Sequence, residues 1–92
     1  MSIGRDGRVL AAKAVHVREF DGEMVLLDLD RGEYYGLDEM GCIMWRGLAA
    51  GESPAEIVGR LAPEHDVAPE RMLSDLVALA DELVRRGLAV PR

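Results

Sequence analysis

The chain has few aromatic residues, a single cysteine and no long apolar run. Phe, Tyr and Trp together make up 4% of its 92 residues. One cysteine, Cys42, cannot form an internal disulfide, which is typical of a protein from a reducing compartment. No segment approaches the ~20 apolar residues that a helix needs to cross a bilayer, and residues 1–13 lack the apolar core of a signal peptide. We therefore expect a cytoplasmic protein with no membrane partner.

Basic residues are fewer than acidic residues. Lys and Arg number 11 against 17 Asp and Glu, which gives a formal net charge of −6. An acidic domain is a poor electrostatic match for nucleic-acid phosphates, so we expect no nucleic-acid partner. A chain of this length forms one modest core and leaves little surface for a deep catalytic cleft.

Catalytic groups are missing as well. A nucleophilic mechanism needs a Cys, Ser or Lys held beside a base, but Cys42 lies between apolar neighbours in a predicted helix, which is typical of a buried core thiol. His16 and His65 stand alone, without the spacing of a metal site. We expect no enzymatic activity, no metal and no cofactor.

What the chain does contain is a pattern of three short strands. Ala14–Phe20 and Glu23–Leu29 are β-rich and flank Asp21-Gly22, a strong two-residue hairpin signal. After a second turn, Glu33–Leu37 predicts a third strand. With the register set by the Asp-Gly turn, both faces are partly apolar. Either a bulge shifts the register or both faces contact something.

Three helices are predicted after the strands. Asp38 is a plausible N-cap for a helix to about residue 49. Ser53-Pro54-Ala55-Glu56 marks the start of a second helix with a capping box, which we expect to stop before Pro63. The third helix is predicted over Pro69 to about Arg86, and the methionines that the helices carry (Met40, Met44 and Met72) are expected mainly to pack in the core.

These elements predict an α+β fold that is winged helix-turn-helix-like, with a three-stranded antiparallel sheet followed by three helices. We expect residues 1–13 to form a flexible N-terminal tail and residues 14–90 to form the domain, with Leu88–Val90 as a last extended piece. The apolar arc of the third helix is broader than a core-facing stripe needs, so the excess could line a groove.

Residues 33–37 admit two interpretations. In the first, the strand has only a structural role: it is short, with Tyr35 and Leu37 in the core and Tyr34 outward. If it is instead an exposed edge, its unpaired backbone groups could accept an extended peptide as an additional strand. The residues alone favour neither interpretation.

The full ordered pattern is similar to a known family. It reads Leu26-Leu27-Asp28, Gly32-x-Tyr34-Tyr35-x-Leu37-Asp38-x-x-Gly41-x-x-x-Trp45, Leu48-x-x-Gly51-x-Ser53-x-x-Glu56-Ile57, Leu61, Val67, Leu76 and Leu83-x-x-x-Gly87-Leu88. This pattern resembles the PqqD-like domains, also called RiPP recognition elements, over about residues 14–90. One departure is Asp38, where many members have Asn, but either residue can cap a helix.

The resemblance implies a non-catalytic module that binds the N-terminal leader of a ribosomally made precursor peptide. It implies that the leader pairs with the third strand and packs against the third helix, in a direction left open here. Carried over by position, the peptide-binding residues are Glu33, Tyr34, Tyr35, Gly36, Leu37, Arg71, Met72, Asp75, Leu76 and Leu79.

Among these domains, the chain looks most like the free-standing lasso-peptide members. Those members imply a separate leader peptidase of the cysteine-protease type and a lasso cyclase as partners, and leaders with a Tyr-x-x-Pro-x-Leu motif. One alternative is a peptide chaperone for a radical enzyme of quinone-cofactor biosynthesis. A winged-helix DNA-binding protein is the other, but the third helix carries Arg71, Arg85 and Arg86 against Glu70, Asp75, Asp81 and Glu82.

Overall fold

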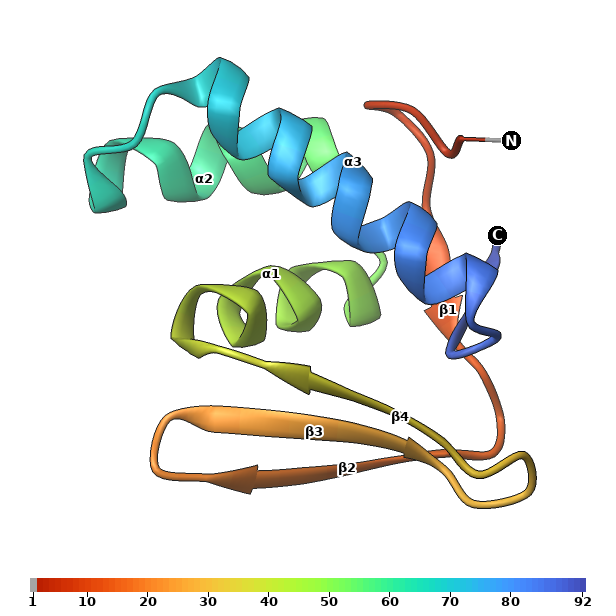
Figure 1. Cartoon of the computed structure of the whole chain (residues 1–92). Coiled ribbons are helices and arrows are strands. Elements are labelled where there is room, and N and C mark those ends of the chain that lie inside the picture. Colours follow the sequence, from red (N-terminus) through yellow and green to blue (C-terminus); the bar gives the residue numbers. More distant parts are fainter. Residues whose placement is uncertain (1) are drawn as a thin grey trace.

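The computed structural model describes residues 2–92 and contains a three-stranded sheet, three helices and a two-stranded ribbon (Figure 1). In chain order the elements are β1 (Val9–Ala11), β2 (Val15–Phe20), β3 (Glu23–Asp28), β4 (Glu33–Leu37), α1 (Glu39–Ala49), α2 (Pro54–His65), α3 (Pro69–Arg85) and β5 (Ala89–Pro91). The predicted fold class, an antiparallel sheet followed by three helices, is confirmed.

The sheet has the order β2-β3-β4 and is antiparallel throughout. Asp21 and Gly22 both have positive φ angles, 50° and 78°, so the predicted tight turn joins β2 to β3. The pairing continues without a bulge from that turn to Val15, which sits opposite Asp28. One face of the sheet, which includes Leu26, is buried against the helices. The other face is partly open to solvent, since Tyr34 is 68% exposed.

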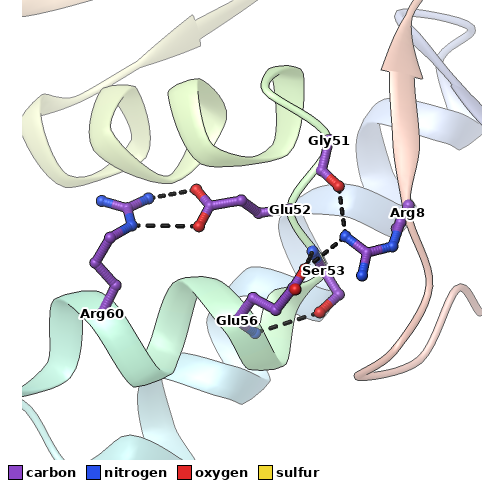
Figure 2. Close-up of polar contacts among 6 residues, drawn as sticks. All are labelled: Arg8, Gly51, Glu52, Ser53, Glu56 and Arg60. Atoms are coloured by element: carbon purple, nitrogen blue, oxygen red, sulfur yellow. Dashed lines mark hydrogen bonds and ion pairs between the residues drawn. The ribbon is translucent and has the colours of Figure 1, made fainter.

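The helices α1 and α2 begin where their capping residues predict. The Asp38 carboxylate accepts a hydrogen bond from the backbone N–H of Gly41 at 2.8 Å, at the start of α1. At the start of α2, the Ser53 hydroxyl accepts from the N–H of Glu56, and the Glu56 carboxylate accepts from the N–H of Ser53 (Figure 2). These side chains satisfy N–H groups that the first turn of a helix leaves unpaired.

The predicted end of α2 is wrong. The helix continues through Pro63 to His65, and Asp66 ends it in the left-handed conformation with φ 52°. A proline interrupts a helix because it lacks an N–H and crowds the carbonyl four residues earlier. Here Pro63 lies in the last turn of α2, so ending the helix before it would avoid little of this cost.

The predicted N-terminal tail, residues 1–13, is partly ordered in residues 2–13, and residue 1 lies outside the described residues. Val9–Ala11 form β1, which pairs antiparallel with β5 at the opposite end of the chain, and Val9 is fully buried. Before β1, the carbonyl of Arg5 accepts a hydrogen bond from the N–H of Ala55 at 2.9 Å. The final extended piece predicted near residues 88–90 is therefore half of a ribbon that joins both ends of the chain.

The core lies between the inner face of the sheet and the helices, with α1 between the sheet and the layer of α2 and α3 (Figure 1). Cys42 and Trp45 are buried in it at 3% and 4% exposure, as expected for both. The α1 and α2 helices approach closely at Gly47, where an added Cβ would lie 2.8 Å from side-chain atoms of Ile57. Within residues 2–92, no helix is long and apolar enough to span a membrane.

Candidate peptide-binding groove

The strand β4 is an edge of the sheet. It pairs with β3 on one side, from Glu33 opposite Asp28 to Leu37 opposite Met24. On its other side no strand of residues 2–92 pairs with it. An edge of this kind presents backbone N–H and C=O groups that can accept a further strand.

A groove runs beside this edge, between β4, α1 and α3. It consists of two adjoining hollows of about 230 and 450 Å³ that share Met40, Met44 and Asp75. The first is lined by Tyr35, Gly36, Leu37, Asp38, Met40, Gly41, Met44, Asp75 and Leu79. The second is lined by Met40, Met44, Asp66, Val67, Ala68, Arg71, Met72 and Asp75. We call these two hollows together the β4–α3 groove.

Seven of the ten residues expected at a peptide site line this groove. They are Tyr35, Gly36, Leu37, Arg71, Met72, Asp75 and Leu79. Residues from β4 and α3, more than thirty positions apart in the sequence, therefore face one continuous hollow surface. This juxtaposition is what strand addition would require.

The other three expected residues lie elsewhere. Leu76 is fully buried, with 0% exposure, so it supports the core and offers no surface to a peptide. Tyr34 points to the outer face of the sheet, away from α1 and α3, because alternate residues of a strand face opposite sides. Glu33 is half-buried at the start of β4, 3.9 Å from the guanidinium of Arg86.

The residues of α1 and of the α2–α3 turn were missed as groove residues. Met40, Gly41 and Met44 line it from α1, and Val67 and Ala68 line it from the turn. The methionines do pack in the core, since Met44 is only 6% exposed, yet they also border the hollow. The clustering of flexible, polarisable methionine side chains was the available signal, because such side chains adapt to varied ligands.

The end of the groove near Glu33 is held by Arg86. Its guanidinium carbon lies 5.1 Å from the centroid of the Tyr35 ring, and its Nε donates a 2.6 Å hydrogen bond to Glu82. Hydrogen bonds from Arg85 and Arg86 lower the pKa of the Glu82 carboxyl. The ring of Tyr35 is thereby held against a charged cluster at the end of α3.

The middle of the groove carries two further charges, Arg71 and Asp75, one helical turn apart on α3. Both are exposed, and neither forms an ion pair with another residue of the described chain. They can therefore meet charged or polar groups of a ligand. The surrounding methionine, leucine and tyrosine side chains make the rest of the surface mainly apolar.

Beneath β4, the thiol of Cys42 is closed off from this surface. Its one S–H group has two acceptors within reach, the carbonyls of Gly22 and Leu37, at 3.5 and 3.7 Å from Sγ. Burial raises the pKa of the Cys42 thiol, and a protonated thiol is a weak nucleophile. Cys42 therefore contributes no reactive group to the groove, whose available interactions are backbone pairing, apolar contacts and the charges of Arg71 and Asp75.

Comparison with solved structures finds two closely similar folds. TbiB1, solved in complex with the TbiA(beta) leader peptide, is 33% identical, with a TM-score of 0.79 over 88% of this chain and 94% of TbiB1. A lasso peptide synthetase B1, complexed with the leader peptide, is 31% identical, with a TM-score of 0.83 over 91% of this chain and 99% of its own. No curated protein matches the chain.

A family model also matches most of the domain. The model for PqqD, coenzyme PQQ synthesis protein D, matches residues 23–89. This range includes β3, β4 and all three helices, and so the whole β4–α3 groove. Together with the two similar structures, it shows that the chain belongs to the PqqD family.

Proposed function

We propose that this protein binds the leader region of a ribosomally synthesised precursor peptide in the β4–α3 groove. The observation that carries the proposal is the groove itself, in which a free strand edge faces an apolar, methionine-rich surface. The likeness to two proteins solved with leader peptides supports it, since each is over 30% identical across nearly the whole domain.

The proposed binding mode is strand addition. The leader pairs with the free edge of β4 through main-chain hydrogen bonds, and its alternate side chains enter the two hollows. Tyr35, Leu37 and Leu79 offer apolar contacts within the first hollow. Arg71 and Asp75 offer charges that can select polar side chains of the leader.

We further propose that the protein is non-catalytic and acts in lasso-peptide biosynthesis. In this role it presents the precursor to a separate leader peptidase and to a lasso cyclase. Its cytoplasmic location stays a prediction from the single, buried cysteine. A role as a peptide chaperone for a radical enzyme would use the same groove, so only the identity of the precursor separates the two.

DNA binding is the weaker candidate. A recognition helix needs free basic side chains on its exposed face, but Arg85 and Arg86 both donate to the carboxylate of Glu82. The formal net charge of −6 adds repulsion from phosphates. No feature of the described residues favours this function over peptide binding.

The test is a fluorescence-polarisation titration with a labelled leader peptide encoded next to the protein. We expect saturable binding that weakens when the apolar and aromatic leader residues are replaced by alanine. A shuffled leader of the same composition is the control. If the native and shuffled leaders bind equally weakly at tens of micromolar, the proposed function is wrong.

A further inference from the structure

A third hollow lies at the turn between α2 and α3, outside the β4–α3 groove. Its volume is about 450 Å³, and it is lined mainly by small and apolar residues, among them Val58, Ala62 and Pro63 of α2. Gly59 contributes no side chain, and a Cβ placed there would meet nothing within 4 Å. The hollow is thus open toward the exposed side of α2.

This hollow adjoins the groove. It shares Asp66, Val67 and Ala68 with the second hollow. The second hollow in turn shares Met40, Met44 and Asp75 with the first, which borders β4 at Leu37 and Asp38. One track therefore runs from the end of β4, past the start of α1, and over the α2–α3 turn.

We infer that the third hollow is an extension of the leader-binding site and receives an apolar leader side chain. The inference rests on the proposed function. A peptide paired with β4 that continues past Leu37 enters the second hollow, and the shared turn residues then lead it to the third. Val67, one of the shared turn residues, is partly buried and packs against the core. The turn between the two hollows is therefore a fixed part of the fold.

Charge limits what can pass along this track. Asp66 lies where the second and third hollows meet, and Asp75 lies where the first and second meet. Neither forms an ion pair within residues 2–92. Acidic leader residues would be repelled at these two points, and the one cation of the second hollow, Arg71, offsets only part of this charge. A neutral or basic segment with one apolar anchor is therefore complementary.

The test fills the hollow without touching the core. Gly59→Phe places a ring in the open space, and Gly59→Ala is the matched control that leaves the hollow empty. Both variants are checked by circular dichroism and thermal melting. We expect full-length leader to bind Gly59→Phe about tenfold more weakly than the control, the effect of losing one buried apolar side chain.

A truncation series on the unmodified protein gives a second, independent measurement. Leaders are shortened from either end to the segment that pairs with β4. We expect shortening from only one end to weaken binding about tenfold, and the peptide so shortened to bind wild type and Gly59→Phe equally. The end that matters then gives the direction of the bound strand.

The outcomes separate this inference from the proposed function. If full-length leader binds wild type, Gly59→Ala and Gly59→Phe with equal affinity, the extension is wrong while leader binding stands. The extension is also wrong if shortening the leader from neither end weakens binding. If wild type does not bind leader at all, both proposals fall.

Discussion

The guanidinium of Arg86 stacks over the ring of Tyr35, with 5.1 Å between the guanidinium carbon and the ring centroid. This contact joins the end of α3 to the middle of β4, two of the elements that form the walls of the β4–α3 groove. Arg86 is itself held by Glu82, one turn earlier on α3. The spacing between the two walls is therefore set at this end before any peptide arrives.

Replacing Arg86 with alanine should loosen that end of the groove. A partly exposed cation–π contact is worth about 0.5–1 kcal/mol, so leader affinity should fall about two- to fivefold, with a small drop in melting temperature. Arg86→Lys keeps the positive charge and can keep part of the cation–π contact, so its leader affinity should lie between those of Arg86→Ala and wild type. Titration of the three proteins with one labelled leader tests this, and wild-type affinity in Arg86→Ala would contradict it.

Gly36→Pro should weaken leader binding by more than tenfold. Proline lacks the N–H that a paired strand uses, and it restricts the strand. Gly36→Ala is the matched control, because an added Cβ there meets no atom within 4 Å. If the N–H of Gly36 points to the free edge, both variants should melt like wild type in a thermal scan. Equal leader affinity of the two variants would rule out β4 as the docking edge.

Leu76 and Leu79, three residues apart on α3, should separate folding from binding. Leu76 is fully buried, so Leu76→Ala should lower the free energy of unfolding by about 2–5 kcal/mol. Leu79 is partly exposed and lines the groove, so Leu79→Ala should instead weaken leader binding with a much smaller loss of stability. Denaturant unfolding and peptide titration of both variants measure this contrast. If Leu76→Ala instead weakened leader binding and Leu79→Ala lowered stability, the face of α3 assigned to the groove would be wrong.

Gly47→Ala should destabilise the protein although alanine favours helix. The new Cβ would lie 2.8 Å from the Cδ1 and Cγ1 atoms of Ile57, and because Ile57 is fully buried, its side chain can turn aside only by repacking the core. Overpacking costs about 1–3 kcal/mol, more than the gain of up to about 1 kcal/mol from replacing glycine. Gly59→Ala, in the open part of α2, should instead stabilise. Urea unfolding of both variants decides the sign.

Glu56 should contribute stability that acid removes. Hydrogen bonds, first from Arg8 and then from the Ser53 backbone, lower the pKa of Glu56 from 4.5 to about 2 (Figure 2). A carboxylate whose pKa is lowered by folding stabilises the folded state fully at any pH above the pKa it has in the unfolded chain. This stability is lost as the pH falls from about 4.5 to 2. The melting temperature of wild type should exceed that of Glu56→Gln at pH 7, and the two should converge near pH 2. A constant difference across this range would be contrary to expectation.

Local signals in the sequence predicted most of the secondary structure correctly. Asp21-Gly22 and Ser53-Pro54-Ala55-Glu56 act within a few residues of themselves, so the turn and the helix start could be recognised without tertiary information. The strand β1 could not, because three residues carry little pattern and their partner lies at the other end of the chain. The end of α2 was predicted too early for a similar reason, since the free-energy cost of Pro63 in the helix depends on how much helix follows it.

The groove was predicted less completely than the fold. The two apolar rows of α3 look alike in sequence, and only the position of α1 decides that Leu76 is core while Leu79 borders the groove. Met40 and Met44 were assigned to packing because methionines of predicted helices more often fill the core than form a binding face. Their contribution to the groove arises from the tertiary arrangement, which places α1 between the sheet and α3.

The ribbon of β1 and β5 has a consequence for how the protein folds. Val9 pairs with Pro91, so the ribbon closes a loop that contains almost the entire chain. Loop closure over such a length is entropically unfavourable until the intervening helices have packed. The ribbon should therefore form late, and its backbone amides should exchange with solvent before those of the core helices, because an element that closes last can open while the rest of the domain stays folded.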